Sequence, residues 1–207
     1  MNSVEAHITY GLAWVSFGLG HSILASATVK SKLEPKLGPY YRITYNVIAS
    51  IHIFVVWLLG IWIFKGADTF EMQNSILTSL SALSVLGIII MVLALREYDL
   101  GLLTGTAQIK NHKLGNTDLD IEPLNTIGLH SYVRHPIYLG AYLLLLGNAQ
   151  NEHGMATAIL GSIYLLVGTH YEERYLTNLY GSAYREYQDK VPSIIPWRGK
   201  VNQPTSH

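Results

Sequence analysis

Five apolar segments restrict the folds open to this chain more than any other feature of its sequence. They cover about residues 8–27, 43–64, 76–95, 136–150 and 155–171. A helix needs about 20 apolar residues to cross the hydrocarbon core of a bilayer, and the first three segments reach that length. The last two are shorter and are joined only by residues 151–154, which favours a tight helical hairpin. The sequence therefore predicts an all-α integral membrane protein with five transmembrane helices.

The basic residues support this layout. Of the 14 lysines and arginines, 13 fall in segments that would share one side of the membrane, and only Lys65 falls on the other. The positive-inside rule places the shared side, with the C-terminus, in the cytoplasm and the N-terminus outside. A soluble protein with long core helices is the alternative, but it does not explain this alternation of charge. We expect a single membrane domain over residues 1–207.

Composition excludes several classes of function. There is no cysteine, so disulfides, thiolate metal sites and a cysteine nucleophile are excluded together. The net charge is zero, which argues against a nucleic-acid partner. The nine histidines form no paired ligand motif, so we expect no metal site. His21, His52 and His170 lie in or near apolar segments, where they either form hydrogen bonds inside the bundle or line a path for substrate.

Two longer polar segments, 96–135 and 172–197, fall on the predicted cytoplasmic side and can meet over the ends of the last two spans. Arg134 and His135 directly precede Pro136, a residue favoured in the first turn of a helix. The free amides of a helix N-terminus attract an anion, and the Arg134 guanidinium suits a carboxylate or phosphate. The alternative is that Arg134 only reaches lipid headgroups.

Glu172 and Glu173 end the fifth apolar segment. Neighbouring helical residues point about 100° apart, so only one of the two can easily face the bundle. An inward carboxylate can hold a cationic ligand or act as a base; the alternative is that both are solvated at the helix end.

Three tyrosines, Tyr180, Tyr184 and Tyr187, follow at the spacing of one helix face. They predict an amphipathic cytoplasmic helix that lies against the membrane. Val191 and Pro192 end this helix and begin an extended cap.

The motifs of these two segments occur together in a fixed order. They are S-Y-V-R-H-P-I-Y-L-G (131–140), E-E-R-Y-L (172–176), G-x-x-Y-x-x-Y (181–187) and V-P-x-x-x-P (191–196). This order resembles the isoprenylcysteine carboxyl methyltransferase superfamily, whose members are membrane enzymes that use S-adenosylmethionine. The match covers about 129–197, a third of the chain. H-S-I-L-A-S-x-x-V-K (21–30) and L-R-E-Y-D-L-x-x-L (95–103) resemble its bacterial branch, which includes methanethiol S-methyltransferases.

The resemblance implies methyl transfer from S-adenosylmethionine to a small thiol or lipophilic acceptor, in a bacterial inner membrane. Arg134 would bind the carboxylate of the cofactor, and Glu172 would hold its amino group or offset its sulfonium charge. The rings of Tyr138, Tyr184 and Tyr187 would pack on its adenine or on its sulfonium. Gly140 would let the cofactor approach the backbone. The implied catalytic residues are Glu172 and Glu173. The cofactor-binding residues carried over are Tyr132, Arg134, His135, Tyr138, Gly140, Glu172, Tyr184 and Pro196, and Tyr187 is added for its aromatic ring.

Some positions depart from the eukaryotic carboxyl methyltransferases. Gly168 stands where those enzymes often carry a basic residue, and Lys190 where they favour arginine. Both departures weaken the prediction of a prenylcysteine acceptor, which remains an alternative. Two further alternatives are a NADPH-dependent reductase of the sterol type, which shares R-H-P-x-Y-x-G, and a non-enzymatic accessory membrane protein.

Overall fold

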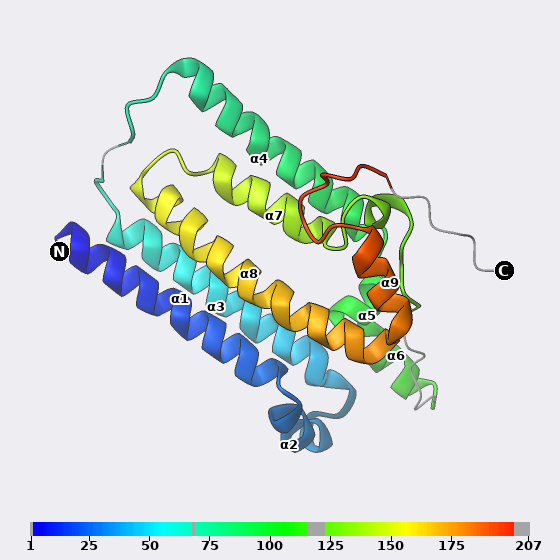
Figure 1. Cartoon of the computed structure of the whole chain (residues 1–207). Coiled ribbons are helices and arrows are strands. Elements are labelled where there is room, and N and C mark those ends of the chain that lie inside the picture. The colour runs from blue at the N-terminus through cyan, green and yellow to red at the C-terminus, as the bar shows by residue number, and fades with distance from the viewer. Residues whose placement is uncertain (1, 68, 116–122, 201–207) are drawn as a thin grey trace. The chain divides into compact units, whose positions relative to one another are not determined.

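The computed structural model describes residues 2–67, 69–115 and 123–200, and these are almost entirely helical. The helices are α1 (Ser3–Ala25), α2 (Ala27–Leu37), η1 (Gly38–Tyr40), α3 (Tyr41–Ile63), α4 (Asn74–Leu95), α5 (Leu100–Thr104), α6 (Thr106–Lys113), η2 (Gly128–Ser131), α7 (Pro136–Gly147), α8 (Glu152–Tyr180) and α9 (Ser182–Lys190) (Figure 1). Among the described residues, β pairing is limited to one bridge, between Thr69 and Asn151. The all-α prediction is confirmed.

The helices form two compact units. Unit 1 contains α1, α2, α3, α5 and α6, and unit 2 contains α4, α7, α8 and α9. The organisation as one membrane domain stays a prediction.

In unit 1, α1 and α3 pack side by side (Figure 1). Their contact includes hydrogen bonds from both histidines that the sequence singles out on these helices. The His52 ring lies 3.1 Å from the Ser16 hydroxyl, and the His21 ring lies 2.7 Å from the Tyr45 hydroxyl. Each ring thus has a hydroxyl partner within the unit, as expected of polar groups inside a bundle.

The first helix ends earlier than predicted. Ser26 has an extended backbone, and its side-chain oxygen accepts the N–H of Val29 at 3.3 Å. It therefore separates α1 from α2 as an N-cap, within what the sequence predicts as the last turn of a single span.

In unit 2, α4 and α7 approach so closely that their backbones touch. A Cβ atom at Gly87 would lie 2.5 Å from the Gly140 carbonyl oxygen, and one at Gly147 would lie 2.5 Å from that of Leu80. Small residues allow the same close approach between membrane helices in general. The sequence predicts that Gly140 lets a cofactor approach the backbone, whereas in the structure Gly140 lets the backbone of α4 approach.

This contact gives a test of the packing. Gly87→Ala is expected to lower the free energy of unfolding by about 1–3 kcal/mol, because the added methyl group must push two backbones apart. Gly168→Ala in α8 is the matched control, since a Cβ there meets nothing within 4 Å and alanine is the better helix former by about 1 kcal/mol. Thermal melting in detergent measures both; equal melting temperatures would contradict the packing.

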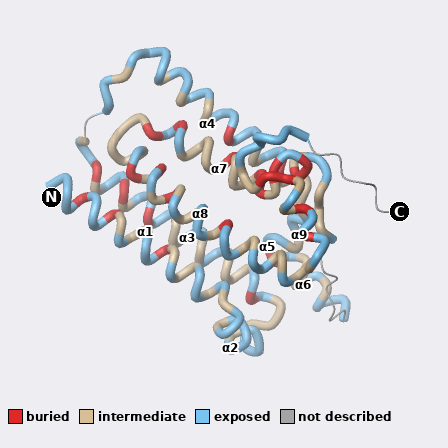
Figure 2. Tube along the Cα trace, viewed as in Figure 1, coloured by how far each residue is buried: buried red, intermediate tan, exposed pale blue. Residues whose placement is uncertain are grey.

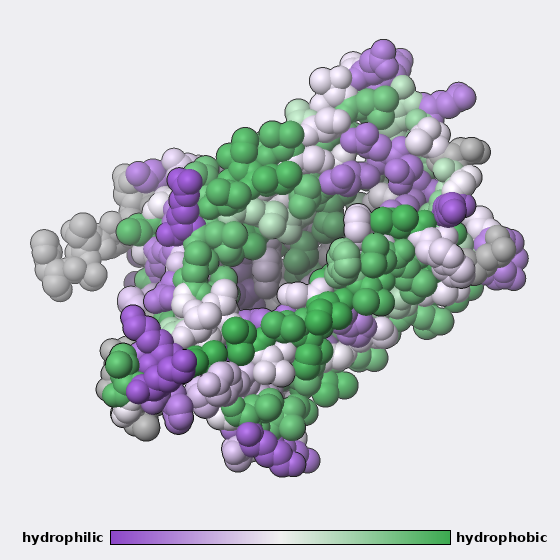
Figure 3. All heavy atoms as spheres, turned by 180° about the vertical axis from the view of Figure 1, so that it is seen from behind, coloured by the Kyte–Doolittle hydropathy of each residue, from purple (hydrophilic) through white to green (hydrophobic). Residues whose placement is uncertain are grey.

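Three stretches are long and apolar enough to cross a membrane: Ser3–Ala25, Ala27–Ile63 and Asn74–Leu95. Many of their large apolar side chains are exposed, including Trp62 at 70%, and apolar side chains cover much of the face in Figure 3. Together with their lengths, this exposure indicates an integral membrane protein. The predicted fourth span is a shorter apolar helix, α7, of 12 residues. Five crossings therefore stay a prediction.

The predicted end of the fifth span is also revised. The α8 helix continues past residue 171 to Tyr180, so Glu172 and Glu173 lie inside a helix and not at its end. It begins at Glu152, where the Asn151 side chain accepts the N–H of Gly154 at 2.8 Å. The tight connection to α7 is therefore residues 148–151.

Buried residues of unit 2 gather on α9 and on the segment before α7 (Figure 2). Tyr184 is 1% exposed and Tyr187 3%, and their cluster packs against Leu124 and Leu176. Tyr184 and Tyr187 are covered by protein and therefore do not face lipid, and the placement of this helix against the membrane stays a prediction. Nor do the three tyrosines share one helix, since Gly181 at φ +61° separates α8 from α9.

Candidate functional site

The two polar segments meet, as the sequence predicts. The Arg134 N–H donates to the Pro192 carbonyl at 2.9 Å, and the His135 N–H donates to that of Ser193 at 3.0 Å. The Tyr187 hydroxyl donates to the His130 carbonyl at 2.6 Å. The chain after α9 is thus bound along the backbone that leads into α7.

Arg134 binds a carboxylate of the protein itself. Its Nε and Nη2 donate to the two oxygens of Glu173 at 2.8 and 2.9 Å, and Nη1 donates to the carbonyls of Gln188 and Val191. Four of the five guanidinium N–H groups are therefore engaged. The side chains of Arg134 and Glu173 are only 10% and 16% exposed. Arg134 therefore does not reach toward headgroups, and its donors are largely committed before any ligand binds.

Glu173 is held by two further donors. The His135 Nε2 lies 2.9 Å from its carboxylate and the Gln188 amide 2.6 Å. Burial alone would raise the pKa of Glu173, but the hydrogen bonds from His135, Gln188 and Arg134 and the charge of Arg134 outweigh it and lower the pKa to about 2. A carboxylate so firmly ionised is a poor proton acceptor near neutral pH, which favours a positioning role for Glu173.

Glu172 presents the opposite situation. Its Oε2 atom is buried and has no hydrogen-bond partner among the described residues. The His135 Nδ1 lies 3.6 Å from this oxygen, too far for a hydrogen bond. The hydroxyl of Tyr184 is likewise buried without a partner in the described part of the chain. Unpaired buried polar atoms cost free energy, so these two are candidates for ligand contacts.

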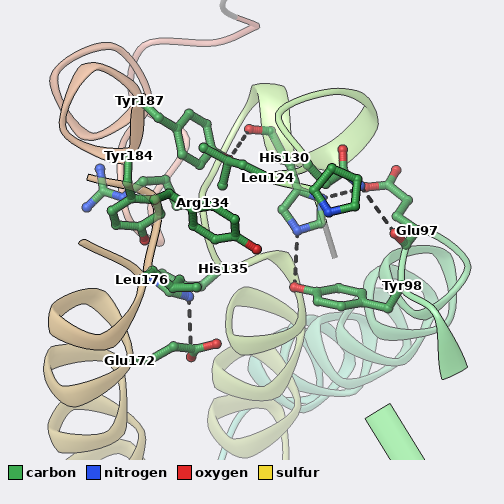
Figure 4. Close-up of a pocket in the computed structure, with 13 residues that line it drawn as sticks. Glu97, Tyr98, Leu124, His130, Arg134, His135, Glu172, Leu176, Tyr184 and Tyr187 are labelled. Atoms are coloured by element: carbon green, nitrogen blue, oxygen red, sulfur yellow. Dashed lines mark hydrogen bonds and ion pairs between the residues drawn. The ribbon is translucent and has the colours of Figure 1, made fainter. Parts of the chain in front are cut away.

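Both atoms belong to residues that line a cavity of about 130 Å³ in unit 2 (Figure 4). The residues that line it come from two parts of the chain. The first part includes residues from 97–98, 123–125 and 130–135, and the second includes residues from 172–187.

The predicted cofactor residues divide into two groups. Those that line the cavity are Arg134, His135, Glu172, Tyr184 and Tyr187. The others do not line it: Tyr132 and Pro196 are exposed, Gly140 packs on α4, and Tyr138 stacks on His135 with ring centroids 5.4 Å apart. Of the histidines predicted to meet substrate, His21 and His52 lie in unit 1, and His170 is exposed on α8.

Three titratable residues of the cavity wall have no role in the prediction from sequence. Glu97 and Tyr98 follow α4, and His130 lies in η2. The His130 Nδ1 lies 2.9 Å from the Glu97 carboxylate, and its Nε2 lies 3.1 Å from the Tyr98 hydroxyl. The sequence signal for Glu97 and Tyr98 was the L-R-E-Y-D-L motif. This motif is part of the family resemblance, but the resemblance assigned it no functional role.

Comparison with known proteins identifies the family. A family model described as "Protein of unknown function (DUF1295)" matches residues 37–191. The chain belongs to the DUF1295 family. The matched range contains every residue that lines the cavity.

Relatives of this DUF1295 chain carry more specific names. Methanethiol S-methyltransferase 1 of Bradyrhizobium diazoefficiens is 29% identical over 205 residues, which are 97% of this chain and 70% of the relative. Methanethiol S-methyltransferase of Crocosphaera subtropica is 29% identical, over 89% of this chain and 72% of its own. Protein-S-isoprenylcysteine O-methyltransferase of Schizosaccharomyces pombe is 37% identical over 79 residues, 35% of this chain and 33% of its own. The predicted resemblance is confirmed. No solved structure matches the chain.

Proposed function

We propose that this DUF1295 protein transfers a methyl group from S-adenosylmethionine to a small thiol at the membrane. The observation that carries the proposal is the unpaired Glu172 carboxylate oxygen in a tyrosine-lined cavity, in a chain similar over 97% of its length to a named methyltransferase.

The donor groups of the cavity fit this cofactor. When bound, S-adenosylmethionine supplies a methyl group activated by a sulfonium charge. Glu172 would accept hydrogen bonds from its ammonium group and offset the positive charge nearby. The Tyr184 hydroxyl would contact a polar group, and the Tyr180 and Tyr187 rings are suited to the adenine. Arg134 and Glu173 would act indirectly, by holding α7, α8 and the segment after α9 together around the cavity.

A small thiol is favoured over a prenylated carboxylate. The two methanethiol methyltransferases named above match 97% and 89% of this chain, whereas the isoprenylcysteine enzyme matches 35%. At Gly168 on α8 a Cβ atom would meet nothing within 4 Å, and this glycine stands where a basic residue would help to hold a substrate carboxylate. Prenylcysteine carboxyl methylation remains the second candidate.

The proposed membrane topology has five crossings, with α7 and α8 as the last two. At about 1.5 Å per residue, the 29 residues of α8 extend about 43 Å, more than the roughly 30 Å of hydrocarbon. The last turns of α8, with Glu172, would then stand in the cytoplasmic interface and α9 would cap them. The basic residues support this orientation, and relatives in bacteria favour a bacterial inner membrane.

The function is tested with the full chain purified in lipid nanodiscs. Calorimetry with S-adenosylhomocysteine should detect binding, and radiolabelled S-adenosylmethionine should transfer its methyl group to methanethiol faster than to prenylcysteine or to phospholipid amines. A folded sample that binds neither form of the cofactor contradicts the proposal. Binding of NADPH instead would favour the reductase, and cofactor binding without any transfer would favour an accessory protein.

A further inference from the structure

A second hollow, separate from the cavity, opens on the surface of α8. Its volume is about 430 Å³, and the residues that line it are His170, Glu173, Arg174, Thr177, Asn178 and Gln188. The first five belong to α8 and the last to α9, which packs against the end of α8 (Figure 1). None of the six lines the cavity beside Glu172, so the hollow is a site of its own.

The one carboxylate of the hollow is already neutralised. Glu173 accepts hydrogen bonds from Arg134 through both of its oxygens, and further ones from His135 and Gln188. The charge of Arg134 therefore offsets that of Glu173, and neither adds a net charge to the hollow.

The basic group of the hollow, in contrast, has its charge to offer. The Arg174 guanidinium and the Asn178 amide form no hydrogen bond or ion pair with any other described residue. Together they carry seven N–H donors, and the His170 imidazole adds at least one N–H in either tautomer. A guanidinium among further donors is the arrangement that recognises a phosphate group.

An apolar strip continues from the hollow along the same side of α8. Ile163 precedes His170 by 7 residues and Arg174 by 11, which are close to two and three helical turns, so the three lie on one line. Ile163, Leu166 and Val167 are 50–63% exposed. This side of α8 thus presents an apolar strip and then a cationic hollow, in the order in which a phospholipid presents its chains and its phosphate.

The length of this strip suits one leaflet of a bilayer. The 11 residues from Ile163 to Arg174 rise about 16 Å along the helix, at about 1.5 Å per residue. Half of the roughly 30 Å hydrocarbon core is about 15 Å. With Ile163 near the middle of the bilayer, Arg174 therefore stands at the level of the lipid phosphates, where the proposed crossing by α8 places its last turns.

We propose that this hollow binds the phosphate of one anionic phospholipid, whose acyl chains lie along Ile163, Leu166 and Val167. The inference rests on the proposed crossing by α8 and not on the proposed chemistry. A lipid with an anionic headgroup is favoured over one that carries an ammonium group, because the charge of Arg174 is unopposed in the hollow and would repel a second cation.

The test is Arg174→Gln in the full chain, studied by native mass spectrometry from detergent. Wild-type protein should retain phosphatidylglycerol about fivefold more tightly than phosphatidylcholine with the same chains. Arg174→Gln should weaken the binding of phosphatidylglycerol by about fivefold, the usual effect of one basic residue near an anionic lipid surface. Its melting temperature should not change, since no described residue loses a hydrogen bond to this guanidinium.

Arg185→Gln is the matched control. It removes the same charge from an exposed residue of α9 that does not line the hollow, so the affinity for phosphatidylglycerol should stay unchanged. An equal loss in the two variants would mean that the lipid answers only to total charge, and would overturn the site. Unchanged binding to Arg174→Gln would overturn it as well.

Two measurements on the wild-type protein complete the test and do not depend on a variant that folds. Excess inorganic phosphate should fail to displace the lipid, and displacement would assign the hollow to a soluble phosphate instead. A phosphatidylglycerol with a photoreactive chain should label residues 163–167 of α8, and labelling confined to other helices would overturn the site. No readout requires methyl transfer, so an inactive protein would overturn the proposed function and leave this inference standing.

Discussion

Arg134→Ala is expected to lower the free energy of unfolding by about 3–5 kcal/mol, the usual cost of removing one partner from a buried ion pair. Glu173, with a side chain only 16% exposed, would keep His135 and Gln188 but lose both guanidinium contacts. The carbonyls of Gln188 and Val191 would lose their donor as well. Thermal or denaturant unfolding in detergent, followed by circular dichroism, measures the change.

Arg185→Ala is the control for loss of one arginine. Arg185 is exposed on α9, and such surface changes usually stay within about 0.5 kcal/mol. A double variant that also replaces Glu173 with alanine should be less destabilised than the sum of the two single changes, because no unpaired charge stays buried. An Arg134→Ala protein as stable as Arg185→Ala would show that the pair does not hold the site together.

Glu172→Gln is expected to weaken binding of S-adenosylhomocysteine by about tenfold to a hundredfold, with little change in melting temperature. The reason is that a hydrogen bond to a charged group contributes about 1.5–3 kcal/mol. Glutamine keeps the shape of the side chain, and the affected oxygen has no hydrogen-bond partner among the described residues, so the fold loses only the 3.6 Å approach of this oxygen to the His135 ring. Isothermal titration calorimetry in nanodiscs gives both the affinity and the active fraction.

Glu186→Gln controls for the loss of one negative charge on the same side of the unit. Its carboxylate lies 3.9 Å from the Lys190 ammonium and its side chain is 73% exposed, so neutralising it should leave the affinity unchanged. An equal affinity for wild type and Glu172→Gln would contradict this prediction, and would mean that the cationic end of the cofactor binds at another wall of the cavity.

The long apolar helices could be predicted because the bilayer imposes a length and a composition that sequence displays directly. The break at Ser26 could not, because a small side chain that caps a helix is also tolerated inside one. The extent of α8 was missed for a related reason. Hydropathy falls at Glu172, and nothing in composition alone tells whether a polar stretch continues a helix.

The order of the motifs predicted that Arg134 lies near Glu172 and Glu173. It did not predict that Arg134 forms an ion pair with Glu173. Sequence places Glu173 39 residues from Arg134, and a carboxylate of the protein is chemically equivalent to one on a ligand. Only the three-dimensional structure shows which carboxylate oxygens lie within 3 Å of the Arg134 guanidinium. Likewise Glu97 and His130, 33 residues apart, carry no periodic signal that would join them.

The hydrogen bonds from the Arg134 and His135 amides to the carbonyls of Pro192 and Ser193 bear on the order of events during synthesis. Helices α4, α7 and α8 all emerge from the ribosome before these carbonyls do, and proteins begin to fold while they are made. The Arg134 and His135 amides nevertheless gain these partners only when residue 193 has been added. A chain interrupted before residue 192 can therefore contain every residue that lines the cavity and still lack the two carbonyls that tie its end to the backbone before α7.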